Sequence, residues 1–270
     1  MVKLVLSDLD GTIVDANGKC DASVVEAIQA FRQQGVKFAV CSGRPIPSVL
    51  PLLADWKLDD CCDYIVGSNG GEVLDVVRNK RVVSYTLEPE VIKEIIDIYE
   101  PLGAIPTYYS DDGILYVQEA TPQTVIIANR LSMPYKEADI RSMINEPQIK
   151  EMFVVEPENM EAIEAYAKEH PDDRYIGFRT SVDLFEVNNR LLSKDVGAQV
   201  VGTLLNITAD EMMAFGDTSN DIEMLSYVKY GIAMGNGTED AKKVAYAVTD
   251  TVDNNGFAKY ITQHVLNQSE

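Results

Sequence analysis

The sequence is poor in positive charge. Lysine and arginine number 23 against 43 aspartates and glutamates, which gives a formal net charge of -20 at pH 7. Proteins that bind nucleic acid or anionic membrane surfaces need positive charge, so the balance disfavours both kinds of partner. An anionic substrate would face the same repulsion, and its site would therefore need a local cation, either a metal ion or a well-placed Lys or Arg.

Histidine, cysteine and long apolar runs are also scarce. His170 and His264 are the only histidines and neither lies in a motif, which disfavours a histidine-based phosphatase. No Walker loop and no Gly-x-Ser-x-Gly elbow is present. No apolar stretch approaches the roughly 18–20 residues of a membrane span. The chain starts Met-Val-Lys and enters a strand pattern without the features of a signal peptide.

The cysteines point to a reducing compartment. None of the four forms a Cys-x-x-Cys pair or a zinc-ligand spacing. We therefore expect reduced thiols in a cytoplasmic protein. The four residues are Cys20, Cys41, Cys61 and Cys62.

What the sequence does contain is an alternation of strands and helices at both ends of the chain. Apolar runs and helical periodicities predict strand, helix, strand, helix, strand over the first 67 residues, which indicates a parallel sheet with helices on its faces. The same alternation of predicted strands and helices resumes from Ser193. The predicted elements are strands 3–7, 36–41, 64–67, 212–215, 231–234 and 247–248, and helices 21–34, 47–54, 194–205, from 220, and 257–266.

The middle of the chain has a different pattern. Residues 72–85 resemble a hairpin, and the next hundred residues mix helices with alternating strands, which indicates antiparallel sheet with one covered face. We predict an α/β protein with a Rossmann-like parallel-sheet core (1–85 and 188–270) and an inserted α+β domain (86–187). The predicted inserted elements are helices 89–100, 123–131 and 157–169 and strands 114–118, 151–155, 175–180 and 183–187.

The strongest motif is Asp8-Leu9-Asp10-Gly11-Thr12, directly after the first strand. Residues two apart in a strand point to the same side, so Asp8 and Asp10 should project together beyond it. Ligands of open α/β sheets bind at the carboxyl ends of the strands. In isolation the two aspartates could merely cap a turn; the apolar strand before them and the motifs below favour a site.

A second acidic motif, Gly216-Asp217-Thr218-Ser219-Asn220-Asp221, follows a later strand. An Asp- and Asn-rich helix start would explain part of it, but capping does not require both aspartates and the asparagine. Together with the first motif it predicts four converging carboxylates, whose repulsion a hard divalent cation would relieve. Magnesium is the usual choice beside phosphate.

Weaker signals surround these two motifs. Ser42-Gly43-Arg44 follows the second strand, where a hydroxyl and a glycine N–H can hold phosphate oxygens. Arg44 could pair with an anionic part of a substrate or make a structural ion pair. Lys194 opens a helix and is the natural counter-charge for Asp8 and a phosphate. Asn69-Gly70-Gly71 could be only a turn into the hairpin.

In the order and spacing of these motifs, the sequence resembles the haloacid dehalogenase superfamily, and within it the Cof-type phosphatases with a type IIB cap. The resemblance implies that Asp8 attacks phosphorus and forms an aspartyl-phosphate, while Asp10 protonates the leaving oxygen and then activates water. It implies Mg²⁺ held by Asp8, the carbonyl of Asp10, and Asp217. It further implies that Asp221 orients the lysine and that the phosphate is held by Ser42, Gly43, Lys194 and Asn220.

One residue departs from the family pattern: Asp195 stands where a glycine often follows the motif lysine, and Gly197 comes two residues later. An acid in the first helical turn is favourable there. The departure puts the local geometry in question, not the family.

The function expected is magnesium-dependent hydrolysis of a small phosphate ester, such as a sugar phosphate or a phosphorylated cofactor. A sugar phosphomutase and a non-enzymatic phosphate-binding protein are the alternatives. The inserted domain should select the leaving group, with residues 108–112 and Arg179 as candidates, and hinges are expected at 83–86 and 187–191. Nothing in the sequence indicates an oligomeric state.

Overall fold

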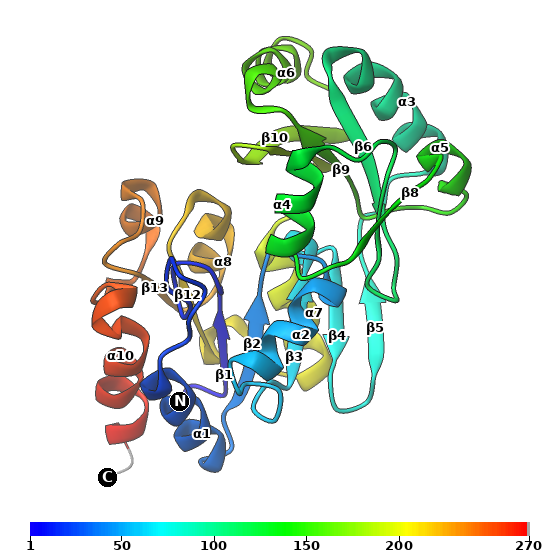
Figure 1. Ribbon diagram of the computed structural model, residues 1–270. Coiled ribbons are helices and arrows are strands. Elements are labelled where there is room, and N and C mark those ends of the chain that lie inside the picture. Colours follow the sequence, from blue (N-terminus) through cyan, green and yellow to red (C-terminus); the bar gives the residue numbers. More distant parts are fainter. Residues whose placement is uncertain (269–270) are drawn as a thin grey trace. The chain divides into compact units, whose positions relative to one another are not determined.

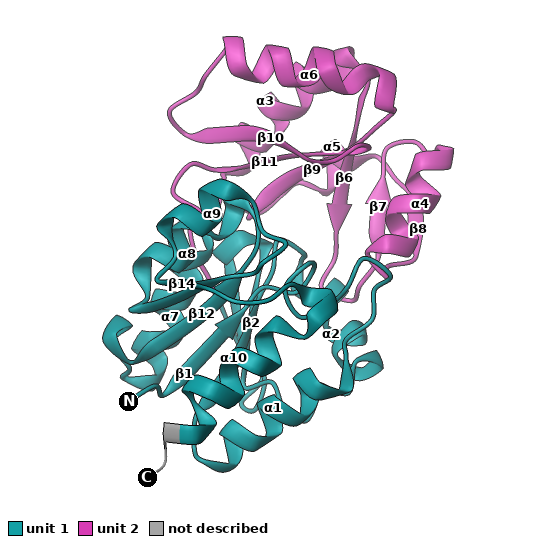
Figure 2. Ribbon diagram, turned by 90° about the vertical axis from the view of Figure 1, so that its left-hand side faces the viewer, with its two compact units in different colours: residues 1–82, 193–270 teal, residues 83–192 magenta. Residues whose placement is uncertain are grey.

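A computed structural model describes residues 1–268 and divides the chain into two compact units (Figure 2). Unit 1 comprises Met1–Val82 and the chain from Ser193 onward, and unit 2 comprises Val83–Leu192. None of the helices in residues 1–268 combines the length and the apolar character needed to cross a bilayer.

Unit 1 is built on an eight-stranded sheet with the order β14-β13-β12-β1-β2-β3-β4-β5 (Figure 1). The six strands from β14 to β3 run parallel, and β4 pairs with β3 in the antiparallel sense. The strands are β1 (Leu4–Ser7), β2 (Lys37–Cys41), β3 (Tyr64–Gly67), β4 (Glu72–Asp75), β5 (Lys80–Val83), β12 (Met212–Gly216), β13 (Tyr230–Ala233) and β14 (Ala247–Val248). Strand β1 lies at the centre, between β2 and β12.

Helices cover both faces of this sheet because successive strand residues point to opposite sides. Val5 packs into one apolar cluster with α1, α2 and α10, while Leu4 and Leu6 pack into another with α7, α8 and α9. The helices are α1 (Ala22–Gln33), α2 (Ile46–Asp55), α7 (Lys194–Leu205), α8 (Ile222–Tyr227), α9 (Glu239–Val244) and α10 (Gly256–His264). Short 3₁₀ turns occupy Ser68–Gly70, Ala209–Glu211, Ser219–Asp221, Val252–Asn254 and Leu266–Gln268.

Unit 2 contains a six-stranded sheet with the order β10-β11-β9-β6-β7-β8. All its strand pairs are antiparallel except β7 with β8. The strands are β6 (Ala104–Tyr109), β7 (Leu115–Val117), β8 (Tyr135–Glu137), β9 (Lys150–Val155), β10 (Tyr175–Ser181) and β11 (Leu184–Asn189). The helices are α3 (Pro89–Tyr99), α4 (Pro122–Arg130), α5 (Ile140–Met143) and α6 (Pro157–Glu169), with a 3₁₀ turn at Glu100–Leu102.

The predicted fold class, an α/β core with a parallel sheet and a second α+β portion, is confirmed. Three details of the second portion were wrong. The central strands β9 and β11 are buried along almost their whole length, not on one face only: Phe153 packs with α3 and α6, and Val154 packs with α4. The sheet is mixed, because β7 and β8 are parallel. Strands β6 and β8 and helix α5 were not predicted; in unit 1, helix α9 was not predicted either.

Candidate active site

Asp8 is the first residue after the central strand β1, and the sheet fixes its main chain. Its amide donates to the carbonyl of Phe215 on β12 over 2.9 Å. The residue is only 7% exposed. The chain then turns at Gly11, whose φ of +86° is a conformation that other residues rarely adopt. A Cβ at Gly11 would lie 2.4 Å from Asp217 Oδ2, so glycine also permits the close approach of the two acidic motifs.

Asp217 and Asp221 follow β12, the neighbour of β1. One carboxylate oxygen of Asp221, Oδ2, accepts hydrogen bonds from the amides of Asp217 (3.0 Å) and Thr218 (3.1 Å). Asp221 is fully buried and Asp217 is 8% exposed. The chain between them is a 3₁₀ turn, so α8 begins at Ile222, two residues after the predicted start at Asn220.

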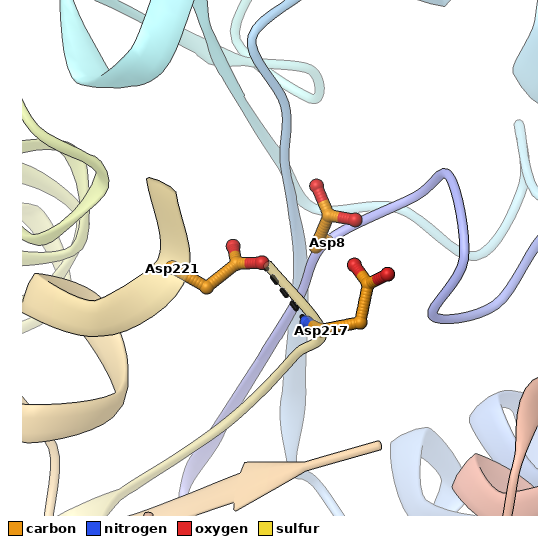
Figure 3. Close-up of side chains that lie close together, drawn as sticks. All are labelled: Asp8, Asp217 and Asp221. Atoms are coloured by element: carbon orange, nitrogen blue, oxygen red, sulfur yellow. Dashed lines mark hydrogen bonds between the residues drawn. The ribbon is translucent and has the colours of Figure 1, made fainter. Parts of the chain in front are cut away.

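Three carboxylates gather at this edge of the sheet. Asp8, Asp217 and Asp221 each contribute an oxygen lying within 4.8 Å of the other two, and Figure 3 shows them side by side. Carboxylate oxygens are the ligands that hard divalent cations such as Mg²⁺ prefer. The donor chemistry of the cluster therefore fits a magnesium ion.

Lys194 supplies the local cation that the acidic chain requires. Its Nζ lies 2.6 Å from Asp8 Oδ1 and 2.6 Å from Asp221 Oδ1, and its side chain is fully buried. Helix α7 begins at this residue. Asp195, the residue that departs from the family pattern, is turned to its own helix, where it accepts hydrogen bonds from Ser193 and Gln199.

The buried charges shift one another's pKa values. Burial raises the pKa of Asp8 to about 8; Lys194 opposes that rise and Asp221 adds to it. Burial and then the Asp221 carboxylate raise the pKa of Asp217 to about 6. Burial acts to lower the pKa of Lys194, but the carboxylates of Asp221 and Asp8 outweigh it and hold the pKa above its usual value. The single ammonium of Lys194 therefore does not neutralise the negative charge of the three carboxylates.

The Asp10 carboxylate is not among the three whose oxygens lie within 4.8 Å of one another, although its charge contributes to the raised pKa of Asp217. Both of its oxygens accept hydrogen bonds from Arg44, with Nε 2.9 Å from Oδ2 and Nη2 3.0 Å from Oδ1. Its side chain is 54% exposed. Of the two roles considered for Arg44, the structure shows an ion pair.

Polar groups from three loops gather around Asn69. Ser42 is 2% exposed, and its carbonyl accepts from the amide of Asn69 over 3.1 Å. The side chain of Asn220 donates to Asn69 Oδ1 over 3.4 Å. A Cβ at Gly43 would lie 3.1 Å from the same oxygen. The structure thus brings Ser42, Gly43 and Asn220 together around Asn69, which the sequence had indicated only weakly.

A loop after β13 also belongs to this region, and sequence analysis missed it. Asn236 Nδ2 donates to the carbonyl of Gly11 over 2.8 Å, and its Oδ1 accepts from the amide of Val252 over 2.8 Å. The amide of Thr238 donates to the carbonyl of Asp217 over 2.7 Å. The sequence signal that could have indicated this loop is Gly-Asn-Gly at 235–237, directly after a predicted strand.

Comparison with known proteins identifies the class. Residues 5–261 match the family described as haloacid dehalogenase-like hydrolase. The chain belongs to this family, which confirms the resemblance seen in its motifs. It is therefore a hydrolase, and several of its relatives bear the names of phosphatases.

Individual relatives match along nearly their full length. The Bacillus subtilis protein YxeH is 27% identical over 269 residues, covering 98% of this chain and 99% of YxeH. The 5-amino-6-(5-phospho-D-ribitylamino)uracil phosphatase YitU, also from Bacillus subtilis, is 24% identical over 264 residues, with 97% of each chain covered.

Solved structures share the fold. A haloacid dehalogenase-like hydrolase from Bacteroides thetaiotaomicron superimposes with a TM-score of 0.88 at 24% identity, covering 97% of this chain and 99% of that one. The subclass IIB sugar phosphatase BT4131 gives a TM-score of 0.82 at 22% identity, with 98% and 100% covered. At these identities the likeness concerns the fold alone.

Proposed function

We propose that this hydrolase is a magnesium-dependent phosphatase that removes phosphate from a small phosphorylated metabolite through an aspartyl-phosphate on Asp8. The observation that carries the proposal is the position of Lys194 Nζ, 2.6 Å from a carboxylate oxygen of Asp8 and 2.6 Å from one of Asp221. Covalent catalysis by a carboxylate needs positive charge beside both the nucleophile and the phosphoryl oxygens.

In the first step, an oxygen of Asp8 bonds to phosphorus while the bond from phosphorus to the leaving oxygen breaks. Asp10 gives its proton to that leaving oxygen. In the second step, Asp10 takes a proton from water, the water oxygen bonds to phosphorus, and the bond to Asp8 breaks to release inorganic phosphate. Lys194 favours the ionised form of Asp8 in both steps.

The metal would be held by Asp8, Asp217 and the backbone carbonyl of Asp10. Asp221 is less available, because its oxygens are already engaged by Lys194 and by two backbone amides. Bound there, Mg²⁺ would neutralise negative charge on the phosphoryl oxygens and on the carboxylates.

Phosphate binding is proposed for Ser42, Gly43, Asn220 and Lys194. The first three are gathered by hydrogen bonds and close contacts around Asn69, which fixes their spacing before any substrate arrives. Preorganised donors of this kind stabilise developing charge without reorganisation during the reaction. Arg44 is a further candidate for contact with the substrate, once it has released Asp10.

The substrate class proposed is a sugar phosphate or a phosphorylated cofactor, with unit 2 acting as the cap that selects the leaving group. The names of YitU and BT4131, a phosphatase of a phosphorylated pyrimidine and a sugar phosphatase, support this range. The net charge of -20 favours small monophosphates over polyanions.

The test is phosphate release from a panel of small phosphate esters, with Mg²⁺ and with EDTA. We expect release that depends on the metal and disappears in Asp8→Asn. The control is Asp59→Asn, which removes an exposed carboxylate of unit 1 and should keep full activity. Release that persists in Asp8→Asn would refute the mechanism. Conversion of a hexose 1-phosphate to the 6-phosphate without net release would identify a mutase instead.

A further inference from the structure

Unit 2 carries a cleft of about 490 Å³ that is made only of its own residues. One wall comes from the end of helix α6 and the other from the edge strand β10. Its lining includes the aromatic residues Tyr99, Tyr175 and Phe178 and the cations Lys168 and Arg179. The volume is typical of sites for small organic molecules. Of the residues considered for phosphate hydrolysis, only Arg179, a candidate for selecting the leaving group, lines this cleft.

The rim of the cleft is electropositive although the whole chain is acidic. Within residues 1–268, neither Lys168 nor Arg190 has a carboxylate at ion-pair distance. Arg179 Nη1 lies 3.6 Å from Glu164, too far for a hydrogen bond, and both side chains are about 40% exposed. The ammonium of Lys168 and the Nη groups of Arg179 and Arg190 are therefore the donors left for an anion, because Arg190 Nε donates to the carbonyl of Asp172 over 2.6 Å and Arg179 Nε donates to that of Ser181 over 3.1 Å.

Besides Glu164, the rim has one other acidic residue, Asp172, and its charge is already neutralised. Asp172 accepts hydrogen bonds from Arg174 at Nε (2.9 Å) and Nη2 (2.8 Å), and the backbone amide of Arg174 donates to it as well. The charge that an entering ligand meets is consequently set by Lys168, Arg190 and the loose ion pair of Arg179 with Glu164, and not by Asp172.

The floor of the cleft carries the hydroxyl of Tyr99, a residue that is 3% exposed and whose ring packs on Phe153, Tyr166 and Phe185. The hydroxyl makes no hydrogen bond within residues 1–268, but it is not cut off from solvent, so it is free to pair with water or with a ligand in the cleft. A Cβ at Gly177 would lie 3.1 Å from this hydroxyl and 2.7 Å from Phe185, so the absence of a side chain at Gly177 keeps the floor open.

We propose that the cleft is a second ligand site, for a small aromatic carboxylate. A flat ring suits the aromatic walls, and a carboxylate suits the fork of Arg179 and the ammonium of Lys168. A hydroxyl or other polar group on the ring would pair with Tyr99. A single negative charge suits this rim better than a dianion, because the chain around it carries a formal charge of -20. This proposal stands whether or not the proposed phosphatase activity is correct.

The test uses 4-hydroxybenzoate as the probe and the full chain labelled with ¹⁵N. We expect saturable shifts of the amide signals of Gly177 and its neighbours on β10. The neutral analogue 4-hydroxybenzamide should bind at least fivefold more weakly, because it lacks the charge. Shifts that are absent, that do not saturate, or that are the same for both compounds would overturn the proposal.

Two variants locate the site. Tyr99→Phe should weaken binding of 4-hydroxybenzoate about fivefold, the effect of one hydrogen bond, without lowering the melting temperature, because the hydroxyl has no partner in the protein. Lys168→Ala should also weaken binding. Lys136→Ala, which removes an exposed cation from β8 at the opposite edge of the same sheet, is the matched control. Equal weakening by Lys136→Ala, or none by Tyr99→Phe, would contradict the assignment.

Discussion

Arg44 donates two hydrogen bonds, of 2.9 and 3.0 Å, to the carboxylate of Asp10. A bidentate pair of this kind fixes the geometry of both partners. The residue proposed to donate a proton to the leaving oxygen thus has both of its carboxylate oxygens engaged by a guanidinium. The pair must open, or its charge must be offset by the substrate, before Asp10 can act as an acid.

Asp10→Asn should separate the two chemical steps. For an alkyl phosphate, we expect turnover to fall by about 10²–10⁴-fold, the usual contribution of general acid–base catalysis. For p-nitrophenyl phosphate the leaving group needs no proton, so Asp8 should still be phosphorylated, while hydrolysis of the aspartyl-phosphate stalls. Rapid mixing should show a burst of one equivalent of nitrophenolate. Unchanged turnover of the alkyl ester, or the absence of a burst with the aryl ester, would contradict this role.

Lys194→Met should damage both stability and activity. Removing one partner from a buried ion pair costs about 3–5 kcal/mol, because the carboxylates of Asp8 and Asp221 lose their counter-charge. Denaturant titration measures this loss. Adding Asp221→Asn should restore part of the stability but none of the phosphate release.

The matched control for Lys194 is Lys259→Met. Lys259 pairs with Asp250 in an exposed ion pair, where both side chains are more than half accessible. Exposed pairs contribute at most about 1 kcal/mol. If both lysine variants lost the same stability, the buried network around Lys194 would not be important for folding.

Magnesium should stabilise the folded chain by mass action. At a concentration 100 times its Kd, a ligand of the native state adds about 2.7 kcal/mol to the free energy of unfolding. Thermal unfolding with Mg²⁺ and with EDTA should show the difference, and Asp217→Asn should abolish it. Asp210→Asn, which removes an exposed acid next to β12, should leave the difference intact. A magnesium effect that survived in Asp217→Asn would place the ion elsewhere.

Glu151 should make stability fall with rising pH. It is 1% exposed, and burial raises its pKa well above the usual value, against the opposing effect of the hydrogen bond from the Thr107 amide. Above about pH 4.5 the unfolded chain releases this proton while the folded chain keeps it, so stability declines until the folded pKa is passed. Glu151→Gln should therefore raise the melting temperature at pH 8 and change it little at pH 4.5. Glu146→Gln, at an exposed position, should do neither.

Much of unit 1 could be predicted because its signals are local. Strand β3 and helix α7 have the predicted bounds, since apolar runs and helical periodicity are properties of short segments. The positions of Asp8 and Asp217 beyond neighbouring strands follow from the rule that parallel strands end at one edge of a sheet. Lys194, at the first position of its helix, completes the group.

The parts that were missed depend on tertiary contacts. Strand β6 contains Pro106 and strand β8 has three residues, so neither shows a strand period. The pairing of Asp10 with Arg44 joins residues 34 positions apart, and nothing near either one distinguishes that partner from a phosphate. The role of Asn236 depends on Gly11 and Val252, which no local pattern links to it.

The central place of β1 has a consequence for synthesis of the chain. One side of β1 pairs with β2, which follows within about thirty residues, but the other side pairs with β12, which begins only at Met212. While a ribosome makes the intervening residues, the backbone groups of Leu4–Ser7 that await β12 stay open to other strands. Molecular chaperones that bind nascent chains would be needed most in that interval. The proposed active site cannot be complete before then either, because Asp217 follows β12 in the chain.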